Sequence, residues 1–283
     1  MADYRTDEQI VCQIARSFGP EDDFVVSATN NSGFVGLVLA KELYAPKISF
    51  YMAAKGRGGI LGDVRYPFVV GAPPEKFIET LIDMEDVFNC VARGKWCIIM
   101  QPVQVDKYGY MNLSLVGDKR APSAVFVGSR GVPDNTVNAP MIIYFVPNHM
   151  KRVFVEKVDF ISGVGYGRER KEGLVKWGAP VRIITNLCVL DFDEETGGVR
   201  LKSIHSGISL DQVKENTGFK LIIPDKVTET DAPTDEELHW IREIIDPAGI
   251  SQLDFAKGKD FTRLLSEIMK GTTYQSLYQK NRS

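Results

Sequence analysis

Short apolar runs alternate with helix-like segments along most of the chain. The apolar runs that predict strands are residues 24–29, 48–52, 68–71, 96–101, 123–128, 141–146, 152–160, 181–186, 188–192 and 199–205. Many of these runs are continuously apolar, which is typical of strands that are covered on both faces. The pattern therefore indicates a buried sheet rather than a series of half-exposed hairpins.

Four segments between these runs have helical spacing or helix-boundary signals. Apolar residues three and four apart predict a helix over 34–43, and 75–94 reads as one or two helices that end at Gly94. Residues 209–218 and 234–247 each begin with a capping box, Ser209 with Gln212 and Thr234 with Glu237.

The alternation predicts an α/β fold with an open, mostly parallel sheet flanked by helices and a β-rich later half. We expect one domain over residues 1–250 and a helical or frayed tail over 251–283. The tail is polar apart from one amphipathic patch, formed by Phe261, Leu264, Leu265 and Ile268.

Composition narrows the classes of function. The 283 residues are 44% hydrophobic and 25% charged, with a net charge of −3, so nothing indicates nucleic-acid binding. The longest apolar runs are too short to span a bilayer, and the polar N-terminus is not a signal peptide. Four scattered cysteines without a CxxC pair fit buried thiols in the cytoplasm, and we expect no metal site.

The segment Asn30-Asn31-Ser32-Gly33 lies between a predicted strand and a predicted helix. Free N–H groups at a helix N-terminus favour negative charge, so the segment is a candidate cradle for an anion or a thioester. An ordinary N-cap is the alternative interpretation. There is no GxGxxG fingerprint, which argues against a dinucleotide enzyme.

The segment Gly128-Ser129-Arg130-Gly131, followed by a predicted turn at Pro133-Asp134-Asn135, is the most informative candidate site. Its glycines allow backbone N–H groups to approach a ligand closely. Arg130 offers two parallel hydrogen bonds to a carboxylate. A solvent-exposed turn with a solvated arginine is the alternative.

The histidines give a weaker signal. His149 follows a strand and is a candidate to line a site, whereas His205 and His239 suggest a turn and a helix surface. No pair of histidines has metal-ligand spacing, and there is no GxSxG elbow for a serine nucleophile.

Residues 47–59, KISFYMAAKGRGG, pose a different question. A predicted strand over 48–52 runs into Ala53, Ala54 and a glycine-rich loop, and no Asp or Glu occurs between Ile48 and Gly62. Chemistry in open α/β sheets usually takes place at the carboxyl ends of strands. Here that end carries no reactive side chain.

Several motifs taken together resemble the β subunit of class I CoA-transferases of the glutaconate type. They are YAP (44–46), QVDKYGYMNLSLVGD (104–118), GSRGVPDNTVN (128–138), NHMKRVFVEKVDFISGVGY (148–166), TNLCVLDF (185–192), IHSGISLDQVKENTGF (204–219) and PTDEELHWIREIIDP (233–247). The resemblance extends over nearly the whole chain to about residue 250. Within that family, the chain looks most similar to the β subunit of steroid ring-cleaving hydrolases that act on CoA thioesters.

The resemblance implies a CoA-transferase-type fold, of the NagB/RpiA class, and an α-subunit partner in an α2β2 assembly. It implies a CoA thioester as substrate and no permanently bound cofactor. Transferases of this type carry a nucleophilic glutamate shortly after YAP, and aligning from that motif places its position on Ala53, or on Met52 if one gap is placed. Neither residue is a carboxylate. An alanine methyl group cannot attack an acyl-CoA.

The predicted activity is therefore hydrolysis of a carbon–carbon bond in a cyclic, β-diketone-like, steroid-derived acyl-CoA. Arg130 and Asn135 are the predicted catalytic residues. The residues predicted to bind substrate or CoA are Asn30, Asn31, Ala53, Gly128, Ser129 and Gly131. An ordinary CoA-transferase subunit, a decarboxylase on the same scaffold and a non-catalytic partner subunit are the alternatives.

Overall fold

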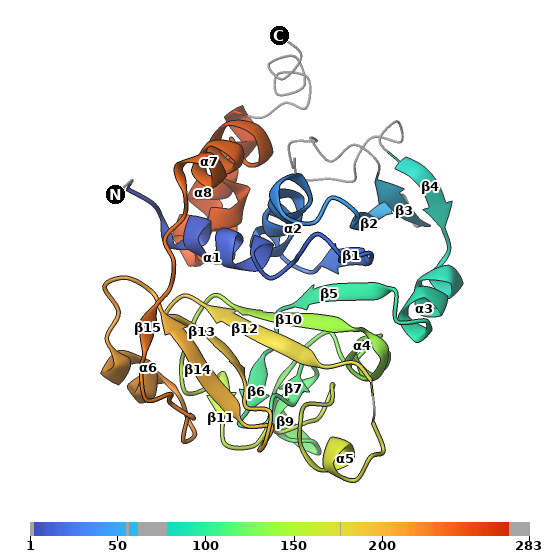
Figure 1. The fold of residues 1–283 in the computed structure, drawn as a ribbon, viewed down its shortest axis with the longest axis vertical. Helices are drawn as coiled ribbons and strands as arrows, with labels where there is room; N and C mark the ends of the chain where they lie inside the picture. Colours follow the sequence, from blue (N-terminus) through green and yellow to red (C-terminus); the bar gives the residue numbers. More distant parts are fainter. Residues whose placement is uncertain (1–2, 55–56, 62–77, 176, 272–283) are drawn as a thin grey trace. The chain divides into compact units, whose positions relative to one another are not determined.

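The computed structural model describes residues 3–54, 57–61, 78–175 and 177–271. They belong to two compact units, a first unit of residues 1–87 with 232–283 and a second unit of residues 88–231. The domain boundary expected at residue 250 stays a prediction. Each unit is described on its own below, and Figure 1 gives the course of the chain.

The first unit combines a four-stranded arrangement with helices from both ends of the chain. Its strands run in the order β1-β2-β3-β4, and β1 pairs with β2 in parallel while β2–β3 and β3–β4 are antiparallel. Its elements are α1 (Thr6–Ala15), β1 (Val25–Ala28), α2 (Asn31–Leu43), β2 (Ser49–Ala54), β3 (Arg57–Leu61), β4 (Ile78–Ile82), α7 (Asp235–His239), a π-helical turn (Trp240–Ile245), a 3-10 turn (Ile250–Asp254) and α8 (Gly258–Gly271).

Helix α1 packs closely on α2 (Figure 1). A Cβ atom on Gly36 would lie 2.6 Å from Ile14 Cγ2, so a glycine is required at this crossing. Charged pairs join α1 to the C-terminal segment: Arg16 Nε donates to Glu237 Oε1 at 2.8 Å, and Arg242 Nε donates to Glu8 Oε1 at 2.7 Å. The C-terminal segment is thereby part of the same unit as the N-terminus.

The second unit contains a sheet with strand order β15-β14-β13-β12-β10-β5, a three-stranded sheet β11-β6-β7 and a hairpin β8-β9. Its strands are β5 (Trp96–Met100), β6 (Gln104–Asp106), β7 (Met111–Asn112), β8 (Leu115–Asp118), β9 (Ala121–Val125), β10 (Met141–Val146), β11 (Phe154–Val155), β12 (Pro180–Thr185), β13 (Cys188–Phe192), β14 (Val199–Ile204) and β15 (Thr228–Glu229). Its helices are α4 (Val132–Asn138), α5 (Arg168–Lys171) and α6 (Leu210–Asn216), while α3 (Met84–Ala92) spans the boundary between the units.

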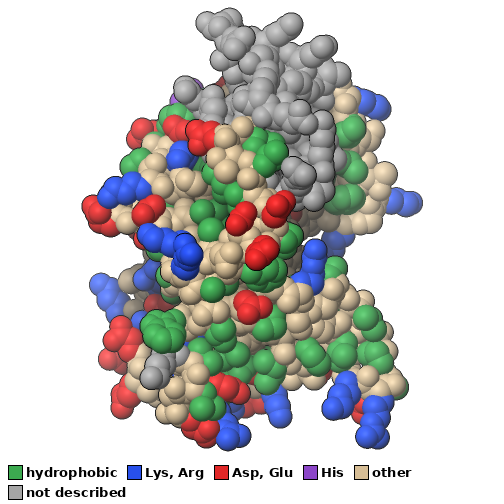
Figure 2. All heavy atoms as spheres, turned by 90° about the vertical axis from the view of Figure 1, so that its right-hand side faces the viewer, with side chains coloured by type: hydrophobic (Ala, Val, Ile, Leu, Met, Phe, Trp, Pro, Cys, Tyr) green, Lys and Arg blue, Asp and Glu red, His purple; other side chains and the backbone are tan. Residues whose placement is uncertain are grey.

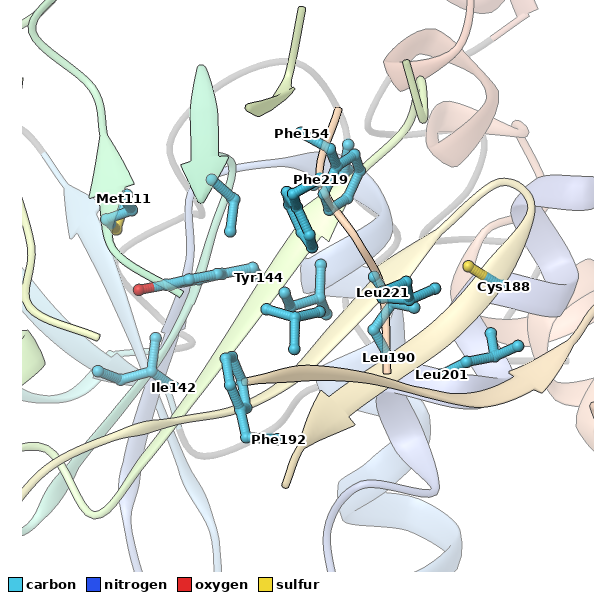
Figure 3. Packing of buried hydrophobic residues seen from close by; sticks show 14 of the residues in the cluster. Met111, Ile142, Tyr144, Phe154, Cys188, Leu190, Phe192, Leu201, Phe219 and Leu221 are labelled. Atoms are coloured by element: carbon cyan, nitrogen blue, oxygen red, sulfur yellow. The ribbon is translucent and has the colours of Figure 1, made fainter. Parts of the chain in front are cut away.

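The core of the second unit lies between its large sheet and the smaller elements around it. All six residues of β10 are buried, and β10 pairs in parallel with both β5 and β12. Figure 3 shows Tyr144 of β10 and Phe192 of β13 within this cluster, and the Tyr144 hydroxyl donates to the Gly109 carbonyl at 3.2 Å. Continuous apolar runs thus correspond to strands covered on both faces, as the sequence predicts.

Two local predictions in the first unit were wrong. The glycine loop predicted after residue 52 is a hairpin, because β2 continues to Ala54 and Gly58 and Gly59 lie in β3. Residues 78–82 form strand β4 rather than helix, because the hydrogen bonds of pairing with β3 override local helical spacing. Helix α1 was not predicted. The predicted strand 68–71 lies outside the described residues.

Candidate functional site

The loop Gly128–Gly131 forms a tight turn in the second unit. Val132 N–H donates to the Ser129 carbonyl at 2.9 Å, which closes a β-turn with Arg130 and Gly131 at its centre. Arg130 has φ 50°, and Gly131 has φ −81° and ψ 3°. A positive φ at the first central position and a negative φ at the second match a type II′ turn, which favours glycine first. Arginine occupies that glycine position here.

Arg130 is therefore held in a strained conformation. Among the described residues, it is the one non-glycine residue with positive φ. A left-handed backbone conformation costs an L-residue about 1–2 kcal/mol. Residues kept in such conformations cluster at active sites and ligand clamps, so the strain favours a functional role over that of an incidental surface turn.

The loop presents hydrogen-bond donors without protein acceptors. The Arg130 side chain is exposed, and within the described part of the chain it forms no ion pair. In the same part of the chain, the N–H groups of Ser129, Arg130 and Gly131 have no hydrogen-bond acceptor. A guanidinium beside free backbone N–H groups is a site for a negatively charged oxygen.

Helix α4 follows the turn and carries Asn135. The residues predicted as a turn over Pro133–Asn135 lie within this helix, which begins at Val132 with a proline in its first turn, so the turn prediction was wrong. Asn135 is buried, and its Nδ2 lies 3.7 Å from the point where a Cβ on Gly131 would stand. The structure thus brings Asn135 together with the loop.

Asn30 and Asn31 lie at the start of α2 in the first unit. Asn30 Oδ1 accepts from Gly33 N at 2.6 Å, which is the geometry of an N-cap. Asp254 fills the expected anion position: its carboxylate accepts from Ser32 N at 2.6 Å and from Asn31 N at 3.3 Å. Burial raises the pKa of Asp254, and the hydrogen bond from Ser32 opposes that shift. The geometry supports the N-cap interpretation, and substrate binding by this segment stays a prediction.

Ala53 lies near the end of β2 and pairs with Gly58 of β3. It belongs to the first unit, whereas Arg130 and Asn135 belong to the second. The sequence provides no carboxylate at this strand end, because no Asp or Glu occurs from Ile48 to Gly62.

His149 is a core residue. Its Nδ1 lies 3.1 Å from Thr185 Oγ1, its Nε2 lies 3.0 Å from Thr217 Oγ1, and its ring stacks on Phe154. Thr217 Oγ1 donates its own proton to the Val213 carbonyl at 2.8 Å. Thr185 Oγ1 likewise donates its proton to a carbonyl, that of Cys188, at 3.0 Å. Burial lowers the pKa of His149 to about 3, so the ring is neutral and structural.

His205 lies in the same kind of environment. Its Nε2 donates to the Thr185 carbonyl at 2.8 Å, and its Nδ1 lies 3.0 Å from Thr230 Oγ1. Burial lowers the pKa of His205 as well. Neither buried histidine is placed to act as a base at an exposed loop.

Two serines that support the loop were missed by sequence reasoning. Ser114 Oγ lies 3.1 Å from Ser129 Oγ and 2.8 Å from Ser162 Oγ. Ser162 opens the glycine-rich stretch 162–167, where Gly163 packs against Thr136. Ser114 and Ser129 are 15 positions apart and Ser162 is 48 beyond Ser114, so local spacing gives no signal for this cluster.

The described residues give no sign of a metal centre or a membrane span. No cluster of three or more His, Cys, Asp or Glu side chains in this part of the chain is arranged to hold a metal ion. None of the helices described above is both long enough and apolar enough to cross a bilayer.

A family model described as Coenzyme A transferase matches residues 60–216, more than half of the chain. The chain belongs to the coenzyme A transferase family. It is 35% identical over 243 residues to the cholesterol ring-cleaving hydrolase IpdB subunit of Mycobacterium tuberculosis (strain H37Rv), which covers 85% of this chain and 95% of that protein.

Solved structures agree with this assignment. The crystal structure of Rhodococcus jostii RHA1 IpdAB matches with a TM-score of 0.81 and 30% identity, over 90% of this chain and 100% of that chain. Glutaconate coenzyme A-transferase from Acidaminococcus fermentans matches with a TM-score of 0.76 and 23% identity, over 90% and 99% of the two chains. The second likeness shows the fold alone. The predicted CoA-transferase-type fold and the predicted family are confirmed.

Proposed function

We propose that this chain is the β subunit of an enzyme that hydrolyses a carbon–carbon bond in a cyclic, β-diketone-like acyl-CoA derived from a steroid. One observation carries the proposal. The turn around Arg130 gathers free hydrogen-bond donors in a strained conformation, while the end of β2, where transferases need a glutamate, has Ala53 and Ala54. The turn is suited to stabilising an oxyanion, and the end of β2 lacks the nucleophile for CoA transfer.

The proposed reaction balances with water alone. Water adds to a ring carbonyl and forms a tetrahedral oxyanion after losing one proton to a base. The carbon–carbon bond then breaks, leaving a carboxylic acid, and its electron pair moves to the second carbonyl as an enolate. The enolate carbon takes up the proton. Both anionic oxygens need donors, and Arg130 with the N–H groups of residues 129–131 supplies them.

Apolar side chains next to the loop suit a bulky hydrocarbon ring. Val125 and Val127 are 72% and 66% exposed, and they lead directly into Gly128. Hydrophobic side chains also gather at the surface among charged ones on the face that Figure 2 draws. An acyl ring that packs on 125–127 would place its carbonyl oxygens beside Arg130.

The proposed enzyme is completed by a companion α subunit in a cytoplasmic α2β2 assembly without a permanently bound cofactor. The M. tuberculosis relative is named as a subunit, and the R. jostii structure is titled IpdAB, which supports a second chain. A histidine of this chain could also act as a base. However, His149 and His205 are both buried in hydrogen-bonded networks. The resemblance to the steroid ring-cleaving hydrolases implies that the companion subunit supplies the general base, as a carboxylate.

The proposal is tested by copurifying both subunits and assaying cyclic 1,3-diketone acyl-CoA with and without an acceptor acid. Hydrolysis proceeds without the acceptor, whereas CoA transfer requires it and decarboxylation releases carbon dioxide. Borohydride treatment during turnover, followed by intact-mass analysis, should leave the mass of this chain unchanged. An acceptor requirement, or a reduced glutamyl adduct on this chain, would replace the proposal by an ordinary transferase.

A further inference from the structure

Three serine hydroxyls form a hydrogen-bonded row that ends in the candidate loop. Ser162 Oγ lies 2.8 Å from Ser114 Oγ, which lies 3.1 Å from Ser129 Oγ. Ser162 is 2% exposed, whereas Ser114 and Ser129 are half-buried. The row therefore runs from the interior of the second unit to the turn that holds Arg130.

The direction of the row follows from counting donors and acceptors. Ser162 Oγ already accepts from Leu113 N at 2.9 Å, and its own proton needs an acceptor. Ser114 Oγ is the one side-chain acceptor beside it among the described residues. A buried hydroxyl proton without an acceptor is costly, so Ser162 donates to Ser114.

The same reasoning fixes the other two hydroxyls. Each hydroxyl has one proton and two lone pairs. Ser114 accepts from Ser162, and its remaining partner in the described structure is Ser129 Oγ, so Ser114 donates to Ser129. Ser129 is thereby an acceptor within the row, and its own proton is free to point away from the protein.

The backbone around the row holds this arrangement in place. Ser114 N donates to Asn112 Oδ1 at 2.9 Å, and Ser162 N donates to the Met111 carbonyl at 2.9 Å. Asn112 is fully buried, and its Nδ2 donates to Gln104 Oε1 at 2.7 Å. The inner end of the row is therefore anchored in a satisfied polar network.

We infer that the Ser129 hydroxyl is a further donor to the anionic oxygen of the substrate, and that Ser114 and Ser162 are positioning residues that direct its proton outward. The ligand class is an oxyanion or enolate oxygen, since Ser129, Arg130 and the free N–H groups all donate. Hydrogen bonds in a chain polarise one another, which strengthens the terminal donor. This inference rests on the proposed function and names a side chain that acts in it.

A double-mutant cycle in the two-subunit enzyme tests the inference, with cyclic 1,3-diketone acyl-CoA as probe. Ser129→Ala should lower kcat roughly tenfold, as loss of one donor to an oxyanion does, with KM within about twofold. Ser162→Ala should lower kcat roughly three- to tenfold. The double variant should match Ser129→Ala alone, because Ser162 acts through Ser129.

Ser123→Ala is the matched control. Ser123 lies in the neighbouring hairpin, where its Oγ donates to the Val116 carbonyl at 3.0 Å, so this variant should retain full activity. Ser114→Ala repeats the cycle if Ser162→Ala fails to fold. Losses that multiply in the double variant, or a Ser129→Ala enzyme with unchanged kcat, would overturn the inference.

The outcomes also separate this inference from the proposed function. A wild-type enzyme that does not cleave the diketone contradicts the proposed function. A wild-type enzyme that cleaves it and loses activity with Arg130→Ala but not with Ser129→Ala contradicts the serine row alone.

Discussion

Arg130 combines an unfavourable backbone conformation with a charge that forms no ion pair among the described residues. At φ 50° the residue is strained whatever its side chain, unless that residue is glycine. A position that keeps arginine where glycine would fit better is one where the guanidinium contributes to function at the expense of stability.

Substitution of Arg130 should separate activity from stability. Loss of its bond to a transition-state oxyanion should lower kcat/KM by roughly 30- to 1000-fold in Arg130→Ala and Arg130→Gly. Arg130→Gly removes strain of about 1–2 kcal/mol but gives the unfolded chain more freedom, worth about 0.5–1 kcal/mol. It should therefore unfold at or above the temperature of Arg130→Ala.

Arg130→Lys serves as the charge-retaining comparison in the same assays. Lysine keeps the positive charge but loses the planar fork, so we expect partial activity at best. Normal turnover in all three variants would support the solvated-turn interpretation of this loop.

His149 should stay neutral far below its ordinary pKa. Its pKa in the folded protein is lowered from 6.5 to about 3, so below pH 6.5 the unfolded chain binds the proton first. Its contribution to stability is full above pH 6.5 and is lost as the pH falls toward 3, at about 1.4 kcal/mol per pH unit.

An NMR titration of the histidine ring signals measures this directly. The His149 ring should stay neutral down to pH 5. Protonation of His149 near pH 6 in the folded protein would contradict the lowering of its pKa by burial.

At the scale of elements, helix α2 depends on a carboxylate that comes from far along the chain. Asp254 accepts from Ser32 N, and Asn31 Nδ2 donates to the same carboxylate at 3.1 Å. The negative charge also lies where the helix dipole favours it.

Asp254→Asn should lower the free energy of unfolding by about 1 kcal/mol, because the charge and one acceptor oxygen are lost. Urea unfolding followed by circular dichroism measures the change. Asp260→Asn is the control, since Asp260 is exposed and its nearest ion-pair partner, Arg263, is 3.9 Å away. Equal stabilities for both variants would mean that Asp254 does not cap α2.

Most buried elements could be predicted from the sequence, and edge elements could not. The strands β5, β10, β12 and β13 coincide with continuous apolar runs, and α2 and α6 with helical spacing or a capping box. β4 was missed because its pairing with β3 is non-local.

The candidate site shows the same limit. The loop at 128–131 could be found because its glycines and arginine are adjacent in sequence. Its positive φ at Arg130 and the serines that support it depend on segments that only the fold brings together.

At the scale of the whole molecule, the account requires a second subunit. The proposed hydrolysis needs a general base, and the proposal assigns that base to the companion subunit. This chain alone should show no turnover of cyclic 1,3-diketone acyl-CoA, and with its companion it should elute as a larger, active complex in size-exclusion chromatography with light scattering. Full activity in a fraction that contains this chain alone would contradict the requirement.

The central claim is that the enzyme uses water to break a carbon–carbon bond. Turnover of cyclic 1,3-diketone acyl-CoA by the two-subunit enzyme in ¹⁸O-labelled water, with mass spectrometry of the product, tests it most directly. The account predicts a ring-opened product that is heavier by one water, retains its CoA thioester and carries the label in its new carboxylate. Release of free CoA from an intact ring, or a label-free product formed only with an acceptor acid, would contradict it.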